Sequence, residues 1–159
     1  MRFRDYWVLV GFILAALTAG AVGGVVTAAG LGDWYLGLTK PKWNPPQWVF
    51  GPVWTALYLL MALAVWRVWL VRSRVPAARA VVGMYFVQLV LNAGWTVLFF
   101  GLRMPGWALV DLVVLLLLLA WLQVYLWEVD QLAGALWVPY VVWVSFAGAL
   151  NAAIWRMNP

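Results

Sequence analysis

The strongest constraint in this sequence is a series of five apolar runs, each long enough to cross a lipid bilayer as a helix. The hydrocarbon core of a membrane requires about 20 helical residues, and 67% of the 159 residues are hydrophobic while 9% are charged. No run shows the strict alternation of a membrane-spanning strand. We therefore predict an all-α membrane protein with a single domain over residues 1–159. Its transmembrane helices are predicted at residues 6–27, 47–70, 80–101, 105–127 and 134–156.

The composition also excludes several kinds of chemistry. Cysteine and histidine are absent, so the chain has no disulfide, no thiolate nucleophile, no imidazole base and no Cys/His metal site. We therefore expect no metal and no cofactor. The net charge of +5 comes mainly from residues near the ends of the apolar runs, which favours contact with anionic lipid head groups. No basic face or reading motif is present, so nucleic acid is not an expected partner.

The first apolar run has two interpretations. Arg2 and Arg4 precede an apolar stretch, and residues 19–21 resemble the cleavage site of a signal peptide. The apolar stretch continues beyond that site to Thr27, as expected for a helix that crosses the membrane. We therefore favour a spanning helix.

A stripe of small residues follows one face of the first run, at Ala16, Gly20 and Gly24. Such a stripe lets two helices approach each other closely, either within one chain or between two copies of it. We favour packing within the chain over a dimer seam.

The basic residues are distributed unevenly over the two ends of the predicted bundle. Six lie on the amino-terminal side and four on the opposite side. By the positive-inside rule, this predicts a cytoplasmic amino terminus and an external loop between the first two helices. The six are Arg2, Arg4, Arg67, Arg72, Arg74 and Arg79, and the four are Lys40, Lys42, Arg103 and Arg156.

The loop between the first two runs, residues 28–46, leads into an unusual segment. Residues 34–54 contain four tryptophans and four prolines. Proline fixes φ and removes a backbone donor, so Lys40-Pro41 and Asn44-Pro45-Pro46 predict a stiff, extended connection. Tryptophan combines a large apolar ring with one N–H, which suits a membrane interface or a flat aromatic ligand. We predict a rigid aromatic lid, with an ordinary interfacial aromatic belt as the alternative.

Amide and aromatic side chains recur inside the apolar runs, where polar groups must be paired. Gln88, Asn92 and Trp95 share one helical face, because they are separated by four and three residues. Trp143 and Asn151 align in a similar way in the fifth run. Two interpretations remain open: these side chains bridge helices, or they line a ligand cavity.

Asp111 is the carboxylate that lies well inside a predicted span. An ionisable group there indicates a functional site, with Asn92, a tryptophan N–H or Arg103 as its candidate partner. We favour the interpretation that Asp111 accepts hydrogen bonds at the start of its helix. Glu128 and Asp130 follow the same run, and we expect them to be solvated in a turn.

Four ordered motifs give the chain a resemblance to a known family. They are WYxxLxKPxWNPPxWVFGPVW at residues 34–54, QLxLNxxWxxxFFG at 88–101, GWALVDL at 106–112 and PYxxWxxFAxxLN at 139–151. On these motifs the chain resembles the translocator protein / tryptophan-rich sensory protein family (TspO/MBR), also called the peripheral-type benzodiazepine receptor family. The resemblance implies a five-helix bundle whose ligand cavity is covered by the first loop, and a homodimer. The Arg-rich, Lys-poor composition indicates a bacterial member, in a bacterial cell membrane.

The resemblance also implies a site that binds porphyrins such as protoporphyrin IX, benzodiazepine-type drugs and sterols. The implied lid and hinge residues are Tyr35, Phe50, Gly51 and Val53. The implied pocket residues are Trp54, Asn92, Trp95, Trp107, Val110, Val114, Trp143, Ala147 and Leu150. Some bacterial members promote light-dependent breakdown of protoporphyrin through pocket tryptophans, and Trp54 and Trp143 match those positions.

The sterol-recognition sequence of the animal relatives is incomplete in this chain. That sequence requires a tyrosine before the arginine at the end of the fifth helix, whereas residues 150–156 have alanines where the tyrosine is expected. The loose pattern is met instead by Leu31, Tyr35 and Lys40. We therefore expect weakened sterol binding.

Three functions fit these residues. The first is a receptor or sensor in which a flat porphyrin stacks on tryptophans, with its carboxylates near Lys40 and Lys42 at the cavity mouth. The second is a transporter of tetrapyrroles or lipids, which five spans disfavour because they cannot form two equal halves. The third is an enzyme acting on porphyrin, for which only light-driven oxidation by indoles remains without histidine or cysteine. We favour the receptor.

Overall fold

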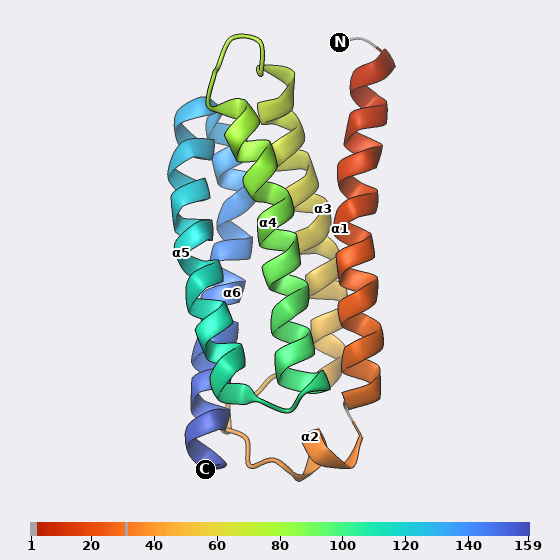
Figure 1. Cartoon of the computed structure of the whole chain (residues 1–159), viewed down its shortest axis with the longest axis vertical. Coiled ribbons are helices and arrows are strands. Elements are labelled where there is room, and N and C mark those ends of the chain that lie inside the picture. The colour runs from red at the N-terminus through yellow and green to blue at the C-terminus, as the bar shows by residue number, and fades with distance from the viewer. Residues whose placement is uncertain (1–2, 31) are drawn as a thin grey trace.

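The computed structural model describes residues 3–30 and 32–159 and shows a bundle of long helices along one axis (Figure 1). Arg2 and Leu31, which enter the predictions above, lie outside the described residues. In the described part of the chain, five helices are long and apolar enough to cross a membrane, which confirms the predicted fold class. They are α1 (Phe3–Gly30), α3 (Gln47–Leu70), α4 (Ala78–Thr96), α5 (Pro105–Val129) and α6 (Gln131–Met157).

Two short elements were not predicted. α2 (Asp33–Gly37) is a short helix within the lid, and η1 (Val97–Gly101) is a π-helical turn that extends α4. Residues 38–46, which contain the first three prolines, form no helix, but the N–H of Asn44 donates to the oxygen of Pro41 (2.9 Å) and closes a turn, so the connection is not extended throughout as predicted.

The long helices form a closed ring in the order α1, α3, α6, α5 and α4, with α4 returning to α1. α3 also contacts α4 across the middle of the ring. The first residues of α1 and the α3–α4 connection lie at one end of the bundle, and α2 and the carboxyl terminus lie at the other (Figure 1). We call these the amino-terminal end and the lid end.

In the half of the bundle nearer the amino-terminal end, packed apolar side chains fill the centre of the ring. Leu115, Leu119, Leu122 and Leu126 of α5 are fully buried, and a spacing of three or four residues places them on one helical face. Trp137 of α6 is fully buried in the same cluster.

The small residues of α1 allow close packing against α3. Ala16 is buried, and a Cβ atom on Gly20 would lie 2.5 Å from Cε2 of Tyr58 on α3. By contrast, nothing lies within 4 Å of a Cβ atom on Gly24. Packing within the chain is therefore confirmed for Ala16 and Gly20, whereas Gly24 faces open space.

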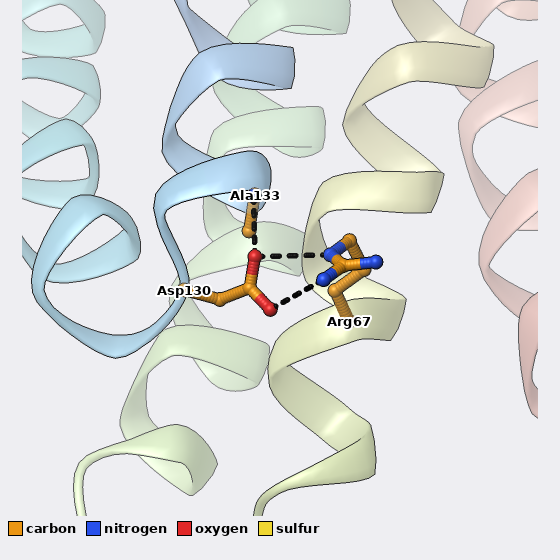
Figure 2. A network of polar contacts seen from close by, with 3 residues as sticks. All are labelled: Arg67, Asp130 and Ala133. Carbon is orange, nitrogen blue, oxygen red and sulfur yellow. Dashed lines mark hydrogen bonds and ion pairs between the residues drawn. The ribbon is translucent and has the colours of Figure 1, made fainter.

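Asp130 joins helices at the amino-terminal end of the bundle (Figure 2). Its carboxylate accepts hydrogen bonds from Nε (2.9 Å) and Nη2 (2.8 Å) of Arg67 on α3, and from the N–H of Ala133 on α6 (2.8 Å). The expectation that Asp130 is merely solvated is therefore wrong. Because an N-cap carboxylate satisfies a free N–H of the first helical turn, α6 begins at Gln131 and not at the predicted residue 134. The hydrogen bond from Arg67 is the main cause that lowers the pKa of Asp130 below its ordinary value.

The substitution Gly20→Ala is expected to lower the thermal unfolding midpoint, because the added methyl group overlaps with the Tyr58 ring. Overpacking of this kind costs about 1–3 kcal/mol. Gly24→Ala is the matched control: its Cβ meets open space, and alanine favours a helix over glycine by about 1 kcal/mol. Circular dichroism of the purified proteins in detergent measures both midpoints. Equal midpoints for the two variants would contradict the close contact at Gly20.

The substitution Asp130→Asn is expected to destabilise the fold at neutral pH and to have no effect in strong acid. The folded-state pKa of Asp130 lies below its ordinary value of about 3.9, so ionisation stabilises the fold at higher pH, and this contribution is lost as the pH falls through the folded-state pKa. The Arg67 side chain is 36% exposed, and pairs of this kind contribute about 0.2–1 kcal/mol. Asparagine is also a good N-cap residue, so a difference in stability between the two proteins reports the loss of the negative charge and not the loss of the cap. Unfolding midpoints of both proteins across the acid range test this, and a difference that does not change with pH would speak against the ion pair.

Candidate functional site

A cavity of about 500 Å³ lies at the lid end of the bundle. It is enclosed by α1, α3, α4, η1 and α6, together with Tyr35 of α2. Its volume falls in the range of about 300–1,000 Å³ that is typical of small-molecule sites. Seven of the residues implied by the family resemblance line it, namely Tyr35, Phe50, Gly51, Trp54, Asn92, Trp95 and Leu150.

Aromatic rings form much of the cavity wall. The Trp54 ring stacks on Tyr58, with ring centroids 5.6 Å apart and an interplanar angle of 29°. The Trp95 ring lies 5.7 Å from Phe99, and Phe99 lies 4.9 Å from Phe100. The wall therefore presents two groups of packed aromatic rings, one on α3 and one on α4 and η1, and aromatic faces of this kind suit a flat apolar ligand.

The π-helical turn η1 brings two of these rings to the cavity. Phe99 and Phe100 both line it, and π-helical turns of this kind frequently occur at functional sites. The end of α1 packs tightly on this turn, since a Cβ atom on Gly30 would lie 2.6 Å from the backbone oxygen of Phe100. Glycine at this position therefore permits the close approach of α1 to η1.

The amide groups of α4 bridge helices, and one of them also reaches the cavity. The Tyr58 hydroxyl donates to Asn92 Oδ1 (2.8 Å), and Asn92 Nδ2 donates to Tyr140 Oη (3.2 Å). Tyr140 in turn donates to Gln88 Oε1 (2.7 Å). Asn92 lines the cavity, whereas Gln88 is fully buried outside it. Asn92 therefore both bridges helices and lines the cavity, the two interpretations that the sequence left open, whereas Gln88 only bridges helices.

A second polar contact links α4, α6 and the start of α5. Trp95 Nε1 donates to Asn151 Oδ1 (3.0 Å), and Asn151 Nδ2 donates to the backbone oxygen of Pro105 (2.7 Å). Since this contact satisfies the indole N–H, the Trp95 ring offers its apolar surface to the cavity.

The lid is stabilised by Lys40, whose Nζ donates to the backbone oxygens of Tyr35 (2.6 Å), Leu36 (3.3 Å) and Leu38 (2.8 Å). A cation near the last carbonyls of a helix satisfies acceptors that have no partner within the helix. Lys40 therefore caps α2. Of the two lysines expected at the mouth, Lys42 has the exposed side chain.

The lid is also tied to the carboxyl-terminal end of α6. Asn158 Oδ1 accepts a hydrogen bond from the N–H of Thr39, and Asn158 Nδ2 donates to the oxygen of Thr39, both at 3.0 Å. Within the lid, the Tyr35 hydroxyl donates to Asn44 Oδ1 (3.4 Å). Burial raises the pKa of the Tyr35 hydroxyl, and this hydrogen bond acts in the opposite direction.

The cavity reaches the surface between α1 and α3. Its lining residues from the other elements are buried or half-buried, and of the described residues that line it none is charged. An opening along the sides of two spanning helices faces lipid, so an apolar ligand can enter from the bilayer. The exposed lining residues are Leu17, Ala21, Gly24 and Ala28 of α1 and Gln47, Gly51 and Thr55 of α3.

Three implied pocket residues lie on the outer face of α5 and do not line the cavity. Trp107 is 62% exposed, and Val110 and Val114 are also exposed. Trp107 and Val110 instead border a shallow hollow with Trp155. The buried face of α5 is occupied by its leucines, so contact of these three residues with a ligand stays a prediction.

Three further implied residues lie near the cavity wall without lining it. Trp143 is half-buried, and its ring lies 5.8 Å from that of Phe50, which does line the cavity. Val53 is half-buried and Ala147 is buried. Their roles also stay predictions.

The sequence interpretation missed the contribution of α1 to the cavity. The signal was present in the stripe of small residues at Ala16, Gly20 and Gly24. Small side chains permit close contact with another helix, but they also leave space for a cavity. The lining residues without a predicted role in ligand binding are Leu17, Gly20, Ala21, Gly23, Gly24, Thr27, Ala28, Gln47, Thr55, Tyr58, Thr96, Phe99, Phe100 and Ile154.

Asp111 does not make the hydrogen bonds expected of it at the start of α5. Its Oδ2 is buried without a hydrogen-bond partner among the described residues. Its Oδ1 faces Gly94 of α4, where a Cβ atom would lie 3.6 Å from it. Asp111 therefore lies at the α4–α5 contact and outside the cavity.

Comparison with known proteins agrees with this architecture. The TspO/MBR family matches residues 12–156. The chain is 42% identical to "Protein CrtK" from Rhodobacter capsulatus over 93% of this chain and 91% of the relative, and 42% identical to the translocator protein of Homo sapiens over 96% and 91%. It is 40% identical to the tryptophan-rich protein TspO of Archaeoglobus fulgidus over 94% and 96%. The chain therefore belongs to the TspO/MBR family and is a multi-pass membrane protein of that family.

Proposed function

We propose that this protein is a membrane receptor or sensor that binds porphyrins, such as protoporphyrin IX, and similar flat apolar ligands. The observation that carries this proposal is the uncharged cavity under the lid, with Trp54, Trp95 and Tyr58 in its wall. A few stacked rings, each adding about 0.5–1.5 kcal/mol beyond burial, give micromolar binding without a metal ligand. The Arg-rich composition supports a location in a bacterial cell membrane.

The charge distribution supports binding of a ligand whose polar groups remain outside the cavity. The carboxylates of a porphyrin cannot be neutralised by the described residues that line the cavity, since these carry no charge. We infer that the apolar macrocycle enters the cavity and that its carboxylates stay outside it, where Lys42, an exposed residue of the lid segment, is a candidate partner. Sterols are weaker candidates, because the chain lacks the tyrosine that the animal pattern requires near Arg156.

The absence of charged side chains from the described lining of the cavity also favours sensing over active transport. Transporters generally place ionisable groups or broken helices at a substrate site near the middle of the membrane. The described lining residues include no ionisable acid or base apart from tyrosine hydroxyls, and Asp111 lies outside the cavity. Binding to this site therefore has no evident coupling to an ion gradient.

The substitution Trp54→Leu is expected to weaken protoporphyrin IX binding roughly two- to tenfold, because it removes one stacked ring from the cavity wall. The fluorescence anisotropy of the porphyrin, titrated with purified protein in detergent, gives the dissociation constant. Trp107→Leu is the matched control, since Trp107 is exposed on the outer face of α5. If Trp107→Leu weakens binding and Trp54→Leu does not, the ligand does not occupy this cavity.

The substitution Gly24→Leu is expected to slow porphyrin association several-fold without lowering the unfolding midpoint. A side chain at Gly24 meets open space in the packed fold but projects into the opening between α1 and α3. Gly11→Leu is the matched control, because Gly11 is an exposed glycine of the same helix with nothing within 4 Å of its Cβ position, and it does not line the cavity. Stopped-flow quenching of tryptophan emission measures the rates. Equal rates in both variants would place the entry route elsewhere.

A further inference from the structure

We propose that the Tyr58 hydroxyl is a fixed hydrogen-bond acceptor in the cavity wall, so that the site prefers flat apolar ligands carrying an O–H or N–H donor. This inference rests on the proposed function, because it concerns which ligands the same cavity selects. It follows from a chain of buried hydrogen bonds whose direction is set at its far end by a methionine.

The chain runs from the cavity wall into the packed core. The Tyr58 hydroxyl lies 2.8 Å from Asn92 Oδ1, and Asn92 Nδ2 lies 3.2 Å from Tyr140 Oη. Tyr140 Oη lies 2.7 Å from Gln88 Oε1, and Gln88 Nε2 lies 3.7 Å from Met61 Sδ. Tyr58 and Asn92 line the cavity, whereas the other three residues belong to the apolar core or are fully buried beside it.

Met61 determines which way each hydrogen bond points. A thioether sulfur carries no hydrogen and can only accept, so Gln88 must turn its NH₂ group towards Met61. The Gln88 oxygen then faces Tyr140 and accepts its single hydroxyl proton. Tyr140 can therefore only accept from Asn92, which must present its NH₂ group, and the Asn92 oxygen is left to accept from Tyr58.

Burial prevents the chain from reversing. Gln88 and Tyr140 are fully buried and Asn92 is 3% exposed, so bulk water cannot supply replacement partners. If both amides were turned over, the Gln88 oxygen would face the sulfur, and two acceptors would lie against each other without a proton between them. Orientations of amide groups are assigned from such networks, and here the network has a single arrangement that satisfies every member.

The consequence for the cavity is a hydroxyl that has already used its proton. The Tyr58 oxygen keeps a lone pair, which can accept but not donate. Its ring is held in place by the stacked Trp54 ring on one side and by the close approach of Gly20. A planar ligand with an O–H or N–H group gains a hydrogen bond at this point, whereas a ligand with only ether or carbonyl oxygens faces an acceptor and gains none.

Two fluorescent probes that differ by one donor test the preference. 1-Hydroxypyrene carries an O–H group, and 1-methoxypyrene has the same flat apolar ring system without it. In the wild-type protein in detergent, we expect the hydroxyl probe to bind roughly three- to tenfold more tightly, after correction for partition into protein-free micelles. In Tyr58→Phe this ratio falls to about one, because the affinity for 1-hydroxypyrene drops and that for 1-methoxypyrene stays. Equal affinities in the wild-type protein, or an unchanged ratio in Tyr58→Phe, would overturn the proposal.

The positioning role of Met61 has its own test, which also covers the case that Tyr58→Phe does not fold. Met61→Leu nearly conserves volume but removes the sulfur acceptor, so Gln88 can turn over and the chain can reverse, which turns Tyr58 into a donor. The ratio between the two probes should fall, while Met84→Leu, a change at an exposed methionine of α4, leaves it unchanged. A ratio that stays the same in Met61→Leu would overturn the role of Met61.

Titration with protoporphyrin IX in the same preparations distinguishes failure of the donor preference from failure of the proposed function. If the porphyrin binds and the two pyrenes bind equally, only the donor preference is wrong. If neither the porphyrin nor the pyrenes bind, the proposed function itself fails. If the porphyrin binds and neither pyrene does, a flat ring system with an O–H group is not enough for binding, and the donor preference is again overturned.

Discussion

The buried hydrogen bonds between Tyr58, Asn92, Tyr140 and Gln88 are the interaction on which the architecture depends. They connect α3, α4 and α6 in the middle of a bundle where water is not available to satisfy polar groups. On the amino-terminal side of these residues the ring is filled with leucine and aromatic side chains. On the lid side, two of these residues, Tyr58 and Asn92, line the cavity. The polar chain therefore forms the boundary between the solid half of the bundle and the hollow half.

Hydropathy alone was enough to predict the five spans and their order, because lipid leaves a chain of this composition few alternatives to helices. It could not predict the rotation of each helix about its axis. α5 is apolar on every side, so the pattern does not distinguish Leu115, which is fully buried, from Val114, which is exposed. The family resemblance implied pocket roles for Trp107, Val110 and Val114, which lie on the outer face of α5, and their contact with a ligand stays a prediction. The same resemblance implied Trp54 and Asn92 as pocket residues, and both line the cavity.

The remaining differences between sequence and structure arise from contacts across long sequence separations. Asp130 has the local sequence of a solvated turn, and only the proximity of Arg67, 63 residues earlier, shows that it closes the bundle. Asn158 holds Thr39 from 119 residues away, which ties the lid to the last turn of α6. The prolines predicted a connection without a helix, but they gave no indication of its partners. Movement of the lid therefore requires loss of the Asn158 contacts as well as any change at the prolines themselves.

The location of the opening has a consequence for how such a site can discriminate between ligands. A cavity that faces lipid along α1 and α3 is reached by every apolar molecule dissolved in the bilayer, so entry alone provides little selection. The described lining residues carry no charge, and the volume of the cavity excludes only molecules that are too large. Selection among the rest must come from the few polar atoms of the wall. Several of those atoms are engaged with one another, as Tyr58 is with Asn92 and Trp95 is with Asn151. The direction of the hydrogen bonds inside the bundle thus decides what the cavity can recognise, and that direction is set by Met61, a residue that does not line the cavity.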